Sequence, residues 1–183
     1  MTPGARYQKC IDILSSFWSS SLPLDRHVKK ECEKARYMGA SDRRFIKAFI
    51  YDFMRHRQLF LQKACSPREE VLLYLIRLLD LDDICHLWSG ENFCPLPLSD
   101  EEKNLCHAFL KHEPAPHERA NIPLWIYTSL SLTHDQWQTL NVPAPVDIWV
   151  NPLKTTPEKL AHRLLKEGYC LHPQGPCSLR GEG

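Results

Sequence analysis

Apolar side chains recur at helical spacing over the first two-thirds of the chain. In residues 5–18 they return every three or four positions and would lie on one face of a helix. The same spacing, with a strongly basic polar face, continues over residues 24–38. Further helices are predicted over 39–57, 67–81, 100–112 and 122–130, with one more short helix opening at 133–136. The pattern is typical of a mainly α fold.

Capping residues mark where two of these helices begin. Ser66 with Glu69, and Ser99 with Glu102, have the spacing of a capping box, in which each side chain accepts a backbone hydrogen bond from the other residue. The segment 89–99 lies between two predicted helices and contains two prolines that lack a backbone donor. A loop is therefore predicted there.

The pattern changes at residue 142. Residues 142–151 are a proline-rich run that leads into a predicted strand. A helix follows, with Thr156 as its cap, Gly168 at its end and an apolar stripe of Leu160, Leu164 and Leu165. Residues 169–183 have the character of a further strand.

A single strand and helix cannot bury their own apolar faces. We therefore expect a helical domain over residues 1–141, followed by an incomplete α+β segment over residues 142–183. The 43% hydrophobic and 25% charged residues are those of an ordinary folded protein. The apolar stretches are too short to span a bilayer and the first residues do not resemble a targeting segment, so the sequence predicts a cytoplasmic protein without membrane contact.

Charge is distributed unevenly along the chain, although the net charge is only +1. Residues 26–57 hold ten Lys or Arg against four Asp or Glu, whereas residues 69–118 hold three against eleven. A basic segment of this kind is a candidate surface for a polyanion. The opposite, acidic segment is a candidate protein contact.

The helix predicted over 39–57 has two different faces. Ser41 is its expected cap, with Asp42 near the positive end of the helix. Six apolar residues fall within about half of the helix circumference, namely Phe45, Ile46, Phe49, Ile50, Phe53 and Met54. The other face carries Arg44, Lys47, Tyr51 and Arg55, with Arg43 at its edge.

Such a basic face suits phosphate groups, and Tyr51 offers a ring on which an unpaired base can stack. Three alternatives stay open at this point. The face is a solvated surface, it contacts a protein, or its charge is neutralised by ion pairs with Asp42 and Asp52.

Few residues suggest metal or catalytic chemistry. The eight cysteines include no C-x-x-C pair, which favours reduced, buried thiols over disulfides. A zinc site is conceivable from Cys85, His86, Cys106 and His107, but no ligand spacing repeats. The run Asp80, Asp82 and Asp83 fits a helix boundary better than a metal site, so no metal and no catalytic residue is predicted.

Three segments resemble one known family. The segment "ARYMGASDRRFIKAFIYDFMRHR" resembles the G-S-x-D-R-R…Y-x-x-x-R motif in the NusB-like N-terminal domain of the RsmB/Sun family, the bacterial rRNA cytosine-5 methyltransferases. "IPLWIYTSL" resembles that family's L-P-x-W-L element, and "APVDIWVNPLKTTPEKLAHRLLKEG" resembles its P-x-x-L-R-V-N-x-L-K…L…L…G block. The segments occur in family order and, with the helical spacing, cover most of the chain.

This resemblance implies a NusB-like RNA-binding domain and the start of a small α+β domain that also grips RNA, with small-subunit rRNA as the partner. The family's arginine before V-N is replaced by Trp149, which either offers stacking area or belongs to the core. Together with the basic face, the resemblance predicts RNA contacts from Arg36, Arg43, Arg44, Lys47, Tyr51, Arg55, Arg57, Asn151 and Lys154.

The family's reaction needs a cysteine nucleophile and S-adenosylmethionine. The sequence offers no glycine-rich cofactor turn, and Cys177 lies well before the region of the family's catalytic loops. We therefore expect this chain to hold no cofactor and to recognise RNA without methylating it. The alternative is a NusB-like helical module for protein interaction or transcription antitermination.

Overall fold

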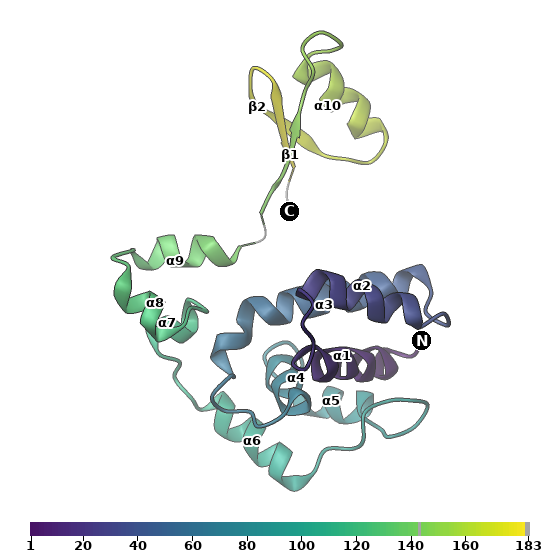
Figure 1. Ribbon diagram of the computed structural model, residues 1–183, viewed down its shortest axis with the longest axis vertical. Helices are drawn as coiled ribbons and strands as arrows, with labels where there is room; N and C mark the ends of the chain where they lie inside the picture. The colour runs from purple at the N-terminus through teal and green to yellow at the C-terminus, as the bar shows by residue number, and fades with distance from the viewer. Residues whose placement is uncertain (143, 182–183) are drawn as a thin grey trace. The chain divides into compact units, whose positions relative to one another are not determined.

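A computed structural model describes residues 1–142 and 144–181 of the chain (Figure 1). Helices contain 56% of the residues and the described strands form one small antiparallel sheet, which confirms the prediction of a mainly α protein. Contacts divide the chain into two compact units, Met1–Thr133 and His134–Gly183. The division falls before the last helix of the helical region, whereas the change in sequence pattern falls after it.

In the part of the chain that the structure describes, all regular elements of the first unit are helices. Its elements are α1 (Pro3–Phe17), α2 (Leu24–Lys34), α3 (Ala40–His56), the short 3₁₀ turn η1 (Arg57–Leu59), α4 (Pro67–Leu75), α5 (Leu81–Leu87), α6 (Asp100–Leu110), α7 (Pro116–Arg119) and α8 (Leu124–Ser129). The helix predicted over 67–81 is interrupted by a turn at 76–80, whose residues are also largely apolar. Residues 89–99 form the expected loop.

The core of this unit lies between α1 and the helices α2, α3 and α4, which all contact it (Figure 1). The apolar face predicted for α3 is confirmed, because Ile46, Phe49, Ile50 and Phe53 are buried. Phe53 has no exposed surface, and its ring centroid lies 5.2 Å from that of Phe60. The opposite face of α3 is thereby turned away from the core.

The start of α3 differs from the prediction. Gly39, not Ser41, is the residue before the first turn, and Asp42 Oδ2 accepts a hydrogen bond from the Gly39 backbone N–H at 3.2 Å. The other carboxylate oxygen of Asp42 accepts from Arg6 Nε at 2.8 Å. Burial raises the pKa of Asp42, but these contacts and the nearby terminal ammonium outweigh it and lower the pKa. Ser41 is wrong as the cap because it lies inside the helix.

Capping of α6 follows the prediction and can be tested. Ser99 Oγ accepts from the Glu102 backbone N–H at 3.2 Å, and Glu102 Oε2 accepts from the Ser99 backbone N–H at 3.0 Å. Replacing Ser99 with alanine is expected to lower the free energy of unfolding by about 1 kcal/mol. Ser41→Ala, inside α3, is the matched control and is expected to change it by less than about 0.5 kcal/mol. Urea unfolding measures both, and equal losses would contradict the capping role.

The second unit contains α9 (His134–Asn141), β1 (Val146–Trp149), α10 (Pro157–Lys166), β2 (Leu171–Gly175) and β3 (Ser178–Gly181). The tail was expected to start one further strand, but it forms two, β2 and β3. They pair as a hairpin, and β3 lies between β1 and β2 in an antiparallel sheet. Helix α10 packs against this sheet. In the sequence, β1 comes before α10, and β2 and β3 come after it.

Within this unit, α10 begins and ends as predicted. Thr156 Oγ1 accepts from the Lys159 backbone N–H at 3.4 Å, and Gly168 has a φ of +90°, the left-handed region that glycine favours. Leu160 and Leu164 are partly buried. Leu165 is 58% exposed and was wrongly assigned to the apolar stripe, because it lies about 100° around the helix from Leu164.

Candidate nucleic-acid interface

The predicted basic residues of the first unit lie on α3 and in the segment before it. Arg44 and Lys47 are exposed, whereas Arg43, Tyr51 and Arg55 are half-buried. Arg36 is exposed in the connection between α2 and α3. This arrangement follows from the helical period, since the apolar residues of α3 occupy its inner side.

A cavity of about 440 Å³ lies at the N-terminal end of this basic face. It is lined by Arg43, Arg44 and Lys47 together with Met38 and Ala40. Three cationic side chains around one cavity form a site for an anion, and guanidinium groups can hold a phosphate through paired hydrogen bonds.

The neutralisation of this face by ion pairs, one of the alternatives above, does not occur. Asp42 pairs with Arg6, and Asp52 accepts a hydrogen bond from the Tyr74 hydroxyl. Among residues 1–142 and 144–181, no ion pair contains Arg36, Arg43, Arg44, Lys47 or Arg55. The positive charge of the face is therefore available to an external anion.

Arg43 also has a donor that no described protein group uses. Its Nε atom is buried and has no hydrogen-bond partner. Buried side-chain donors are mostly paired in folded proteins, so this one is unusual. Hydrogen bonding within the described chain does not account for the position of Arg43.

Lys9 of α1 adds a cation that the sequence analysis missed. Burial raises the pKa of Cys32, and Lys47, Arg43 and Lys9 act together in the opposite direction. Lys9 belongs to α1, whereas Arg43 and Lys47 belong to α3. No local pattern in the sequence indicates that Lys9 acts on the same thiol as the α3 cations.

Arg57 differs from the other predicted contacts. Its Nη2 atom lies 2.8 Å from Glu70 Oε1, and its guanidinium carbon lies 3.9 Å from the centroid of the Trp18 ring. Glu70 is buried, so these contacts hold η1 against α4 and the end of α1. Because its donors are engaged inside the protein, we leave Arg57 out of the interface proposed below.

Asn151 and Lys154 belong to the second unit, whereas α3 belongs to the first. The Asn151 side chain accepts a hydrogen bond from the Leu153 backbone N–H at 3.0 Å, which forms a turn after β1. Lys154 is exposed in the same turn. Trp149 is 77% exposed at the end of β1 and is therefore not a core residue of its unit.

The cysteines and the acidic run have structural surroundings. All eight cysteines are free, and burial raises the pKa of Cys106 to about 11. Asp82 and Asp83 lie in the first turn of α5, so the acidic run marks a helix start as predicted. Within residues 1–142 and 144–181, no three His, Cys, Asp or Glu side chains form a group that could hold a metal ion.

Fold and surface together define a mainly α protein with a small antiparallel sheet and one basic helical face. No described helix combines the length and the apolar character needed to cross a membrane. No family model, curated protein or solved structure matches this chain. The expectation of a NusB-like domain therefore continues to rest on the three sequence motifs.

Proposed function

We propose that this chain is an RNA-binding module that holds structured RNA by its phosphates on the basic face of α3. The observation that carries the proposal is the cavity lined by Arg43, Arg44 and Lys47, whose charges are not paired within the described chain. Two further arginines belong to the face: Arg36 precedes these three cations in the sequence, and Arg55 follows them. Phosphate contacts of this kind supply affinity and orientation without reading sequence.

The proposed partner is small-subunit rRNA, and the proposed relatives are the N-terminal regions of the RsmB/Sun methyltransferases. Both parts of this proposal are supported by the three motifs and their order. We further propose that methyl transfer, with its S-adenosylmethionine, belongs to a catalytic domain outside this sequence.

The proposal predicts binding that depends steeply on salt. With about three to five phosphates neutralised, the logarithm of the association constant is expected to fall with the logarithm of salt concentration at a slope of roughly −2 to −4. Fluorescence anisotropy of a labelled small-subunit rRNA fragment, titrated over a series of salt concentrations, measures this slope. Absence of binding at the lowest salt would refute the proposal.

A protein-interaction module is the second candidate, and exposed apolar side chains on and after α8 favour it. Trp125 is 71% exposed, Leu124 55% and Leu130 51%. An apolar protein interface tolerates salt, whereas phosphate contacts weaken as salt screens and replaces them. Binding of a partner protein that persists at high salt, together with no RNA binding, would favour this candidate.

A further inference from the structure

A second cavity, of about 740 Å³, lies beside α1 and carries two exposed aromatic rings. It is lined by residues from α1, from the connection after α2 and from the loop 89–99. Phe93 of that loop is 90% exposed, and Tyr37 is 69% exposed. Exposed aromatic rings are costly in water, so two that line the same cavity suggest a ligand with flat faces.

The backbone of Phe93 is held in an unusual conformation. Cys94 N–H donates to Glu91 O at 2.8 Å, and the two central residues of this turn, Asn92 and Phe93, have φ values of 50° and 64°. Left-handed φ at both central positions is the pattern of a type I′ turn, which favours Asn first and Gly second. Phe93 occupies the glycine position, and its exposed ring gains no core packing in return. A strained residue of this kind points to a role in binding.

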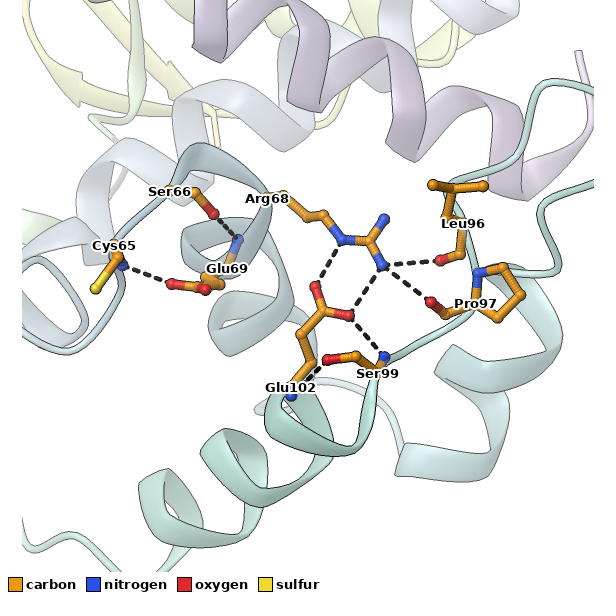
Figure 2. A network of polar contacts seen from close by, with 8 residues as sticks. All are labelled: Cys65, Ser66, Arg68, Glu69, Leu96, Pro97, Ser99 and Glu102. Atoms are coloured by element: carbon orange, nitrogen blue, oxygen red, sulfur yellow. Dashed lines mark hydrogen bonds and ion pairs between the residues drawn. The ribbon is translucent and has the colours of Figure 1, made fainter.

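The loop that carries Phe93 is firmly attached to the helices around it. Figure 2 shows Arg68 of α4 donating to Leu96 O at 2.8 Å through Nη2 and to Glu102 Oε1 of α6 at 2.6 Å through Nε. Gly90 N–H donates to Pro95 O at 2.8 Å, which closes the loop at its base. These bonds order the segment on both sides of Phe93.

Close packing against α1 completes the attachment of this loop. A Cβ atom at Gly4 would lie 2.2 Å from Leu87 O and 2.6 Å from Cys94 Sγ, so only glycine permits this approach. Cys94 also contacts Thr2, the cap of α1, with 3.6 Å between Sγ and Oγ1. The ring of Phe93 is thus presented at the cavity by an ordered turn.

Two consecutive residues line the aromatic cavity and the basic cavity, respectively. Tyr37 lines the first and its neighbour Met38 lines the second. Lys9 of α1 also lines the aromatic cavity and supplies a cation there. The segment 37–38 thus links the cavity with the aromatic rings to the cavity with the α3 cations.

The cavity also contains groups that can pair with the edge of a base. Gln8 Nε2 donates to Asp12 Oδ1 at 2.8 Å, and both residues line the cavity. An amide next to a carboxylate offers both donors and acceptors, as base recognition in RNA requires. Aromatic faces with polar edge groups match a nucleobase more closely than an aliphatic side chain.

We propose that Phe93 and Tyr37 form a stacking site for one unpaired nucleobase of the RNA whose phosphates are held by the α3 surface. This inference rests on the proposed function and names the feature that the protein recognises, an unstacked base in otherwise structured RNA. Double-stranded RNA keeps its bases stacked, so it can use the basic face but not this site.

The test compares two RNA duplexes of equal length, one fully paired and one with a single unpaired 2-aminopurine. The wild-type protein is expected to bind the second more tightly and to change its 2-aminopurine fluorescence through stacking. Phe93→Gly is expected to weaken binding of that RNA by about 5- to 100-fold and to abolish the fluorescence change. Tyr37→Ala is a second variant with the same expected direction.

The glycine variant separates recognition from folding. Glycine suits a left-handed position, so Phe93→Gly is expected to melt at or above the wild-type temperature. Leu96→Ala is the matched control, because Leu96 is 69% exposed in the same loop and does not line the aromatic cavity. It is expected to leave both affinities and the fluorescence change as in the wild type.

The outcomes distinguish the inference from the proposed function. If the wild type binds both duplexes equally and Phe93→Gly has no effect, the stacking site is refuted while salt-dependent phosphate binding stands. If the wild type binds neither duplex at low salt, both the stacking site and the RNA-binding function are refuted. Preferential binding that disappears in Phe93→Gly but not in Leu96→Ala supports the stacking site.

Discussion

Reversing the charges of Arg44 and Lys47 together is expected to weaken RNA binding by about 25- to 60-fold at about 0.1 M salt. Both side chains are exposed and line the basic cavity, so glutamate at these positions is compatible with the fold. Each phosphate contact contributes about 0.7 to 0.9 to the salt slope, and two lost contacts make the slope shallower by about 1.4 to 1.8. At about 1 M salt the phosphate contacts add almost nothing to the affinity. From there to about 0.1 M is one unit in the logarithm of salt concentration, so the shallower slope corresponds to a loss of about 25- to 60-fold.

A matched double variant distinguishes a local site from a general charge effect. Lys103→Glu combined with Lys111→Glu changes the net charge equally, at the end of the chain's acidic segment. We expect a small loss in affinity and an unchanged salt slope. Anisotropy titrations of the three proteins over the same salt series measure this difference. Equal slopes in the two double variants would remove the α3 surface from the proposed function.

Glu118→Gln is expected to lower the free energy of unfolding by about 2–3 kcal/mol at neutral pH. The Glu118 carboxylate is buried and accepts from Lys63 Nζ at 2.6 Å and from the Ala115 backbone N–H at 2.8 Å. His112 Nε2 lies 3.2 Å from Glu118 Oε2. Loss of the charge leaves the partly buried Lys63 ammonium without its counter-ion, which is the main cost.

The pH dependence of this contribution has a defined direction. Burial by itself raises the pKa of Glu118, but the bonds from Lys63, Ala115 and His112 outweigh it and lower the pKa from its ordinary value of 4.5 to about 2. The folded state therefore binds the proton less readily than the unfolded state. The stabilisation is complete above about pH 4.5 and is lost as the pH falls toward about 2.

Urea unfolding of the wild type and of Glu118→Gln between about pH 7 and pH 2.5 tests this dependence. The difference between the two proteins is expected to shrink as the pH falls. Glu113→Gln is the control, because the Glu113 side chain is 88% exposed although it lies 3.0 Å from Arg119. An exposed pair of this kind contributes little, so a change below about 0.5 kcal/mol is expected. A constant difference between wild type and Glu118→Gln would contradict the lowered pKa.

Helix boundaries show where sequence reasoning worked and where it failed. Ser99 was identified as a cap because its partner Glu102 lies only three residues away, within the same turn. Ser41 was misassigned because α3 begins after Gly39, which has no side chain to serve as a capping signal, and Asp42 accepts from the Gly39 backbone N–H. The contact between Asp42 and Arg6 spans 36 residues of sequence and has no signature in a local pattern.

In the small sheet, too, the local pattern identified a strand but not its pairing. Residues 142–151 were identified as leading into a strand from their own alternation and prolines. The pairing of β1 with β3, which makes the tail a three-stranded sheet, depends on residues more than twenty positions apart. The sequence pattern therefore indicated one further strand where the structure has two.

By itself the sequence determined the mainly α class, the two faces of α3 and the helix starts at Ser66, Ser99 and Thr156. These features depend on side chains within one or two helical turns, where the helical period and backbone capping dictate geometry. Only the tertiary structure decided which charges are paired, because Arg57 meets Glu70 of another helix and Asp42 meets Arg6 of α1. It alone also brought Phe93 and Tyr37 to one cavity, since packing of distant segments has no signature in local spacing.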